Sequence, residues 1–162
     1  MPTTCVGCAE SKPAAQKWIL GHWQNEVHHV FKSNESLSAG GGSCVKHGQY
    51  CNASSRRIDL GSCGFSCQAF SQKRWRGGQT AGTGSTEGHH LFDVPMGGFP
   101  AYMEARRPAI FFLEEVMGFN RQLAVLGGVS PMKALAERIG KLGYAVRAFH
   151  LDTSCWIEVP RL

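Results

Sequence analysis

The sequence of 162 residues lacks the features of a membrane-spanning or secreted protein. It has no run of about 18 apolar residues, so we expect no membrane-spanning helix. Residues 1–10 do not combine a basic region with an apolar block, so we expect no secretory signal. No internal repeat is visible. A chain of this length typically forms one domain, with enough residues to bury a core.

The cysteine count and the net charge bear on the cellular compartment and on the kind of partner. The seven cysteines are an odd number, which without a secretory signal favours a reducing compartment and at least one free thiol. The formal net charge of +5 is compatible with a polyanionic partner, although many proteins this basic bind no nucleic acid. The 20 glycines exceed the usual share of about 7%, and many of them fall in two clusters, which predicts long Gly-rich loops.

The first half of the chain predicts short elements separated by loops. Ser11 and Pro13 begin a predicted helix that ends after Trp23, and Trp18 and Trp23 are expected to pack in its core. Residues 27–31 alternate apolar and polar side chains, which predicts a strand. The Gly-, Ser- and Asn-rich residues 36–55 predict a long loop, and residues 58–60 predict a second strand.

The second half predicts a more regular pattern. A short helix is expected near Tyr102 and Met103, and the apolar residues 109–113 predict a strand buried on both faces. Ser130 caps a predicted helix that Gly143 ends, and residues 144–151 predict the next strand. Alternating strands and helices indicate an α/β fold with a mostly parallel sheet, in which ligands bind beyond the carboxyl ends of the strands.

Two chemically reactive side chains follow predicted strands. Cys67 comes shortly after the strand at residues 58–60, and Glu114 comes directly after the strand at residues 109–113. A cysteine and a carboxylate at neighbouring carboxyl ends can act as nucleophile and acid. The alternative is a structural cysteine beside a solvated acidic turn.

The residues around these two positions resemble the DNA cytosine-5 methyltransferase family. DLGSCGFSCQAFS at residues 59–71 is similar to the family's G-F-P-C-Q-x-F-S nucleophile motif, and RPAIFFLEEV at residues 107–116 is similar to R-P-x-x-F-x-x-E-N-V. GHHLF at residues 88–92 resembles an intervening G-x-L-F segment. Residues 142–160 resemble the L-G-Y strand that leads to V-P-Q-x-R. The four segments occur in the family's order.

This resemblance implies a covalent mechanism. Cys67 matches the nucleophile that adds to C6 of a flipped cytosine, and Glu114 matches the glutamate that binds the base edge near N3. The methyl donor would be S-adenosylmethionine, the partner DNA, and the compartment intracellular (nuclear in a eukaryote, otherwise cytoplasmic). The fold implied is a partial Rossmann-like methyltransferase sheet with long Gly-rich loops.

The resemblance also assigns residues to DNA. Residues 72–88 correspond to the mobile catalytic loop, whose cations suit phosphate contacts; the alternative is a linker with solvated charges. The residues predicted to contact DNA are Gln68, Ser71, Lys73, Arg74, Arg76 and Arg161.

The sequence departs from the family pattern at several points. Ser66 replaces the proline before the nucleophile, and Glu115 replaces the asparagine after the glutamate, which adds a negative charge beside Glu114. No F-x-G-x-G loop for the donor precedes Val27, and no target-recognition domain follows. We therefore expect an N-terminal helical segment at residues 1–26 and a partial catalytic domain at residues 27–162, and these missing parts make its autonomous activity doubtful.

Two other functions stay open at this stage. One is a catalytically inactive remnant that binds nucleic acid through the basic loop. The other is a small zinc-binding interaction module, with ligands from Cys5, Cys8, Cys44, His47 and Cys51. The adjacent pairs at residues 28–29 and 89–90 are not expected to bind one metal, because neighbouring side chains on a strand point to opposite faces.

Overall fold

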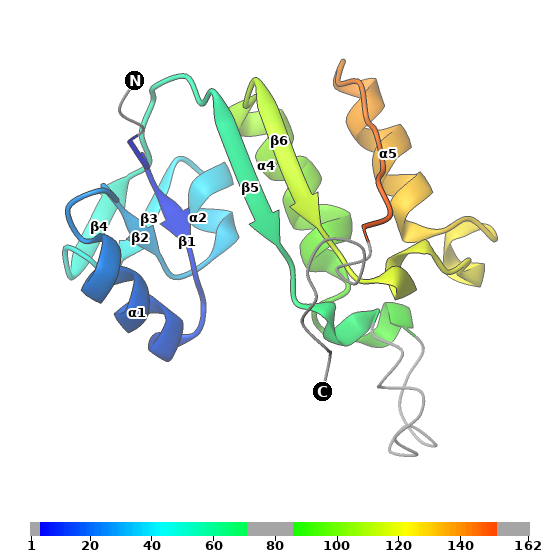
Figure 1. Cartoon of the computed structure of the whole chain (residues 1–162), viewed down its shortest axis with the longest axis horizontal. Helices are drawn as coiled ribbons and strands as arrows, with labels where there is room; N and C mark the ends of the chain where they lie inside the picture. Colours follow the sequence, from blue (N-terminus) through cyan, green and yellow to red (C-terminus); the bar gives the residue numbers. More distant parts are fainter. Residues whose placement is uncertain (1–3, 71–85, 152–162) are drawn as a thin grey trace.

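The structure is a computed structural model that describes residues 4–70 and 86–151. Figure 1 shows a mixed α/β molecule with two small sheets. The first sheet has the order β1-β2-β3-β4 and the second pairs β5 with β6. The α/β class is therefore confirmed, whereas one continuous, mostly parallel sheet is not formed by the described residues.

The first sheet begins with a strand–helix–strand unit. Strand β1 (Cys8–Ala9) leads through α1 (Pro13–Trp23) to β2 (Val30–Phe31), which lies parallel to β1. One further parallel bridge joins Cys5 to Val27. It connects the N-terminal segment expected at residues 1–26 to the domain expected to begin at residue 27. The predicted helix is confirmed, but Trp18 and Trp23 are about half exposed and do not form a core.

The predicted loop at residues 36–55 is wrong. This segment contains α2 (Asn34–Ser38) and a hairpin of β3 (Gly41–Cys44) and β4 (Gln49–Asn52). Strands β3 and β4 are antiparallel, and β3 is antiparallel to β2. The many glycines of this segment are typical of a loop. In the structure Gly41 lies close to Cys51 and Gly42 lies close to Ser36, and neither position has room for a Cβ.

The second sheet positions the candidate site. Strand β5 (Leu60–Gly64) is parallel to β6 (Ile110–Glu114), with Leu60 opposite Ile110 and Gly64 opposite Glu114. Between them the chain passes through η1 (Cys67–Ala69), η2 (Thr86–Gly88), the π-helix η3 (Val94–Gly98) and α4 (Phe99–Arg106). The strand predicted at residues 58–60 therefore begins at Leu60 and extends four residues further, to Gly64.

The main core lies on one face of this parallel pair. Helices α4 and α5 (Pro131–Lys141) enclose it together with η1 and η4 (Met117–Asn120). Its buried side chains are Ala69, Phe70, Phe99, Met103, Phe119, Leu135 and Ile139. On the other face Ile110 and Phe112 are 58% and 64% exposed, so the prediction of a strand buried on both faces is wrong. Helices cover one face only (Figure 1).

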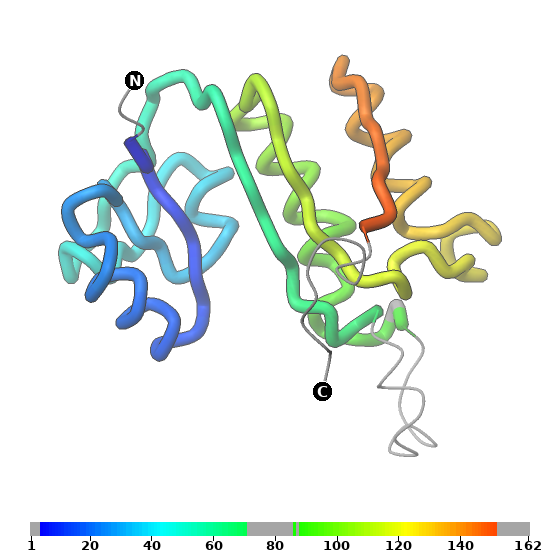
Figure 2. Tube along the Cα trace, viewed as in Figure 1, coloured from blue at the N-terminus to red at the C-terminus, as the bar shows by residue number. Residues whose placement is uncertain are grey.

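The C-terminal part of the described chain packs without forming a strand. Helix α5 is capped as predicted, because the Ser130 hydroxyl accepts a hydrogen bond from the Lys133 N–H at 3.2 Å. After η5 (Ala124–Leu126) and α5, residues 144–151 run back beside α5 toward the end of β6 (Figure 2). They pair with no strand, so the predicted strand there is wrong. No helix of residues 4–70 and 86–151 is long and apolar enough to cross a membrane.

Candidate functional site

Glu114 lies at the carboxyl end of β6, directly opposite the last residue of β5. The parallel register pairs Glu114 with Gly64, and a Cβ on Gly64 would lie 3.3 Å from a carboxylate oxygen of Glu114. The Glu114 side chain is exposed on the face that the helices leave open. The strand pairing therefore places the Glu114 carboxylate over the end of β5.

Cys67 follows β5 by three residues and begins η1. Its side chain is exposed, as is that of the neighbouring Gln68, whereas Ala69 and Phe70 are buried. The turn closes with a hydrogen bond from the Phe70 N–H to the Cys67 carbonyl oxygen at 3.0 Å. One end of this short turn is thus fixed in the core while the thiol faces solvent, the exposure that a nucleophile for a large substrate needs.

The two chain segments are held together by packing behind them. The ring of Phe70, three residues after Cys67, meets the ring of Phe119 edge-on at a centroid distance of 4.8 Å. Gly118 lies against the backbone of Phe70 with no room for a Cβ between them. Phe92, from the segment between the two motifs, packs on Phe70 at 5.7 Å. The turn that begins at Cys67 and the chain after Glu114 are therefore packed against the same aromatic side chains.

Two further segments of the resemblance meet at the start of β6. The Arg107 guanidinium donates to the Leu142 carbonyl oxygen, and the Tyr144 hydroxyl donates to the Pro108 carbonyl oxygen at 2.8 Å. The backbone of Arg107, at the end of α4, adopts the left-handed conformation with φ 46°. These contacts join the R-P segment to the L-G-Y segment.

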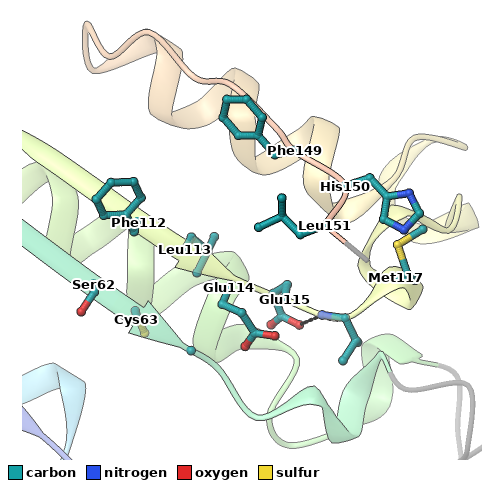
Figure 3. A pocket seen from close by; sticks show the side chains of 12 residues that line it. Ser62, Cys63, Phe112, Leu113, Glu114, Glu115, Met117, Phe149, His150 and Leu151 are labelled. Atoms are coloured by element: carbon teal, nitrogen blue, oxygen red, sulfur yellow. Dashed lines mark hydrogen bonds between the residues drawn. The ribbon is translucent and has the colours of Figure 1, made fainter. Parts of the chain in front are cut away.

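A hollow of about 940 Å³ lies at the end of the parallel pair, and Glu114 lines it (Figure 3). Its other lining residues come from the ends of β5 and β6, from the segment after β6, and from residues 149–151. Phe112, Phe149 and Leu151 make one wall apolar. Cys67 is not among the lining residues; it lies beyond Gly64, on the chain that leaves the rim of the hollow.

Glu115 differs from Glu114 in its surroundings. One of its carboxylate oxygens accepts from the Val116 N–H at 3.0 Å, and the other is buried with no hydrogen-bond partner among the described residues. Burial, and then the nearby charge of Glu114, raise the pKa of Glu115 to about 7, although its hydrogen bond to Val116 lowers it. When protonated, Glu115 is uncharged like the asparagine of the family pattern.

Cys63 is the other thiol near this site, and it is chemically different from Cys67. It is half-buried on the helix-facing side of β5, and burial, followed by the charge of Glu115, raises its pKa to about 11. A thiol with such a pKa is almost entirely protonated at neutral pH and is a poor nucleophile. The exposed thiol of Cys67 is the better placed of the two to attack a substrate.

Several predicted residues fall outside the described part of the chain. These are Ser71, Lys73, Arg74, Arg76 and Arg161, together with most of the predicted catalytic loop. Gln68 is described and exposed beside Cys67.

A second group of reactive side chains lies in the first sheet. His29, Cys44, His47 and Cys51 offer ligand atoms that all lie within 4.8 Å of one another. The sequence predicted three of these residues as zinc ligands and missed His29, because it was judged only as part of an adjacent pair. Cys5 and Cys8, also predicted as ligands, are not part of this group.

Comparison with models of protein families, with curated proteins and with solved structures gave no match to this chain. The function therefore has to be argued from the residues and their geometry.

Proposed function

We propose that this chain is a DNA cytosine-5 methyltransferase or its catalytic part, in which Cys67 and Glu114 act on one flipped cytosine. The observation that carries the proposal is the in-register pairing of Gly64 with Glu114. It sets the carboxylate at the strand end from which the Cys67 turn continues. The residue types and their order also match the family segments at residues 59–71 and 107–116.

The chemistry follows from the electronic structure of cytosine. Cytosine C5 is a weak nucleophile while the ring is aromatic. Addition of the Cys67 thiolate forms an Sγ–C6 bond and breaks the C5–C6 double bond, which moves electron density to C5. Glu114 binds the base edge and holds a proton at N3, which makes C6 more electrophilic. C5 would then take the methyl group that S-adenosylmethionine supplies, with S-adenosylhomocysteine as the leaving group. Loss of the C5 proton to a base restores the C5–C6 double bond and expels the thiolate.

The target base has to leave the duplex before this addition. A cytosine stacked in DNA hides C6, so the base must rotate to the rim of the hollow, between Glu114, which lines it, and Cys67, which lies on the chain that leaves the rim. The apolar wall formed by Phe112, Phe149 and Leu151 offers a surface on which a base can stack. The phosphate contacts are assigned by resemblance to Lys73, Arg74, Arg76 and Arg161.

S-adenosylmethionine supplies the electrophilic methyl group when bound. The unit β1–α1–β2 has the parallel strand–helix–strand arrangement that binds nucleosides beyond its carboxyl ends. The exposed Glu35 follows β2 in the first turn of α2, where an acidic side chain can bind ribose hydroxyls. A Cβ on Gly7 would lie at an ordinary contact distance of 3.5 Å from the Phe31 ring, so the argument for a donor site rests on Glu35 and not on this glycine. Calorimetry should show donor binding that Glu35→Ala weakens and Glu104→Ala does not.

Covalent trapping tests the proposal without the donor. A duplex with pyrimidin-2-one in place of one cytosine accepts a thiolate at the carbon equivalent to C6 and lacks the amino group. We expect the full chain to form an adduct that survives denaturing electrophoresis. Cys67→Ser should form none, and Cys5→Ser, which changes another exposed thiol, should react like the wild type. An inert wild-type chain, or an adduct that persists in Cys67→Ser, would refute the proposal.

A further inference from the structure

The four-residue group in the first sheet is built by a β-hairpin and the strand beside it. Strand β3 ends at Cys44, the turn contains His47, and β4 carries Cys51. The register pairs Gly42 with Cys51, so Cys44 and Cys51 share one face of the hairpin with no side chain from Gly42 between them. Gly48, with φ +68°, closes the turn after His47.

His29 reaches the same point from the neighbouring strand. Phe31 pairs with Cys44, and His29 lies two residues earlier, so its side chain is on the same face as the two thiols. The rings of His29 and His47 meet edge-on with centroids 5.2 Å apart. The neighbouring His28 is not part of the group. Four side chains therefore converge, from β3, from β4, from the turn between them and from the residue just before β2.

Three distances within the group are close to the edges of a zinc tetrahedron, and all of its ligand atoms lie within 4.8 Å of one another. Zinc bonds of about 2.3 Å to sulfur and about 2.0–2.1 Å to nitrogen place tetrahedral ligand atoms about 3.3–3.8 Å apart. The Sγ atoms of Cys44 and Cys51 lie 3.4 and 3.3 Å from Nδ1 of His47, respectively. The Sγ atom of Cys44 lies 3.9 Å from Nδ1 of His29. A thiol–imidazole hydrogen bond explains any one of these pairs but not the convergence of four ligand atoms.

We propose that His29, Cys44, His47 and Cys51 form a structural zinc site. Two thiolates and two imidazoles suit Zn²⁺, and four protein ligands leave no open position for a substrate. Binding releases the thiol protons of Cys44 and Cys51 and involves no redox change. The proposal does not depend on the chemistry proposed for Cys67 and Glu114, because none of the four residues belongs to β5, β6 or the hollow.

The place of the site in the fold explains what the metal would do. The buried apolar side chains of this sheet are few, chiefly Val27, Val30 and Phe31. A small core of this kind gives limited stability, and a metal is a common supplement. The Lys46 ammonium donates to the carbonyl oxygens of Gln24 and Val27 at 2.8 and 2.7 Å, so this nearby cation is paired with the α1–β2 connection. Zinc would fix the hairpin to β2 and so to the β1–α1–β2 unit.

Metal titration of the full chain tests the site. After treatment with a chelator and a reductant, the chain should bind one equivalent of Zn²⁺ and gain thermal stability. Co²⁺ should give the visible absorption of a tetrahedral site with thiolate ligands. His29→Ala should weaken zinc binding at least tenfold, whereas the adjacent His28→Ala should bind like the wild type. Absence of stoichiometric zinc, or equal binding by the two variants, would overturn the proposal.

Thiol protection gives an answer even if a variant does not fold. Zinc added to the wild-type chain should protect Cys44 and Cys51 from alkylation, as mapped by mass spectrometry, and should leave Cys5 reactive. Protection of Cys5 and Cys8 instead, or a Cys44–Cys51 disulfide that persists under reductant and excludes metal, would contradict the assignment.

Discussion

Gly64 and Glu114 are partners at the end of the parallel pair of strands, and the Glu114 carboxylate lies in tight contact with the position that a side chain on Gly64 would take. A Cβ on Gly64 would lie 3.3 Å from the carboxylate oxygen. The glycine thus lets the carboxylate lie over β5, close to the chain that leads to Cys67. This relationship ties the position of Glu114 to a single residue that can be changed without altering either proposed catalytic side chain.

Gly64→Ala is expected to impair the reaction more than the fold. The new methyl group would push the flexible Glu114 side chain aside by a few tenths of an ångström, and misplacement of this size reduces the rate by on the order of tenfold. The measurement is the rate of adduct formation on pyrimidin-2-one DNA. Gly140→Ala, in α5 with open space around it, is the control and should keep the wild-type rate. A Gly64→Ala rate equal to that control would contradict the role given to Gly64.

Gly118→Ala is expected to destabilise the protein. A Cβ there would overlap the Phe70 carbonyl oxygen and lie 2.9 Å from its carbonyl carbon, and backbone atoms cannot move aside cheaply. Overpacking of this kind costs about 1–3 kcal/mol, and we expect the upper part of that range in urea unfolding. Since the displaced backbone belongs to the turn that begins at Cys67, adduct formation should fall as well. A loss below about 0.5 kcal/mol would show that the contact is not tight.

Glu115→Gln is expected to remove one source of pH-dependent stability. Because the pKa of Glu115 is raised to about 7 in the folded state, the neutral form is favoured there. The stability that the neutral carboxyl contributes is fully present when the pH is below its ordinary pKa of 4.5. It is lost as the pH rises through about 7. Glutamine should therefore stabilise the protein at pH 8 by about 1 kcal/mol, after allowance for solvent screening. Unfolding curves at pH 5 and pH 8 check this prediction. If Glu115→Gln changed the free energy of unfolding equally at both pH values, Glu115 would not be the source of pH dependence.

Alkylation should distinguish the two thiols near the site. Burial raises the pKa of Cys63 to about 11, so only about 0.1% of it is thiolate at pH 8, and its access is restricted. Cys67 is exposed at the start of η1 and should be modified well before Cys63. Peptide mapping after brief treatment with iodoacetamide measures both in one sample. Equal or faster modification of Cys63 would argue against the assignment of Cys67 as nucleophile.

Local signals in the sequence predicted the elements that begin or end at a characteristic residue, such as a capping serine or a proline. The Ser130 cap, the following proline and the apolar spacing fixed α5, and a proline marked the start of α1. The apolar run before Glu114 identified β6. The helices form from interactions between residues near in sequence, so a pattern read along the chain is sufficient to find them. Strand β6 was found from its apolar run although its partner, β5, is distant in the sequence.

Long-range pairing was harder to predict. The hairpin of β3 and β4 was taken for a loop, since glycines that permit close approach of backbone and side chains also occur in loops. Residues 144–151 have the pattern of a strand but no partner among the described residues. The contribution of His29 was likewise invisible, because its nearest neighbours in the cluster are 15 and more residues away. Which strand pairs with which is a property of the whole chain.

The most direct test of the joint action of Cys67 and Glu114 is exchange of the cytosine C5 hydrogen with water in the absence of any methyl donor. Addition of Cys67 to C6 makes C5 basic, so reversible addition should release tritium from DNA labelled at C5 of cytosine. We predict release by the full chain, none by Cys67→Ser, and at least tenfold slower release by Glu114→Gln. Release that is unchanged in Cys67→Ser, or absent from the wild-type chain, would contradict the account.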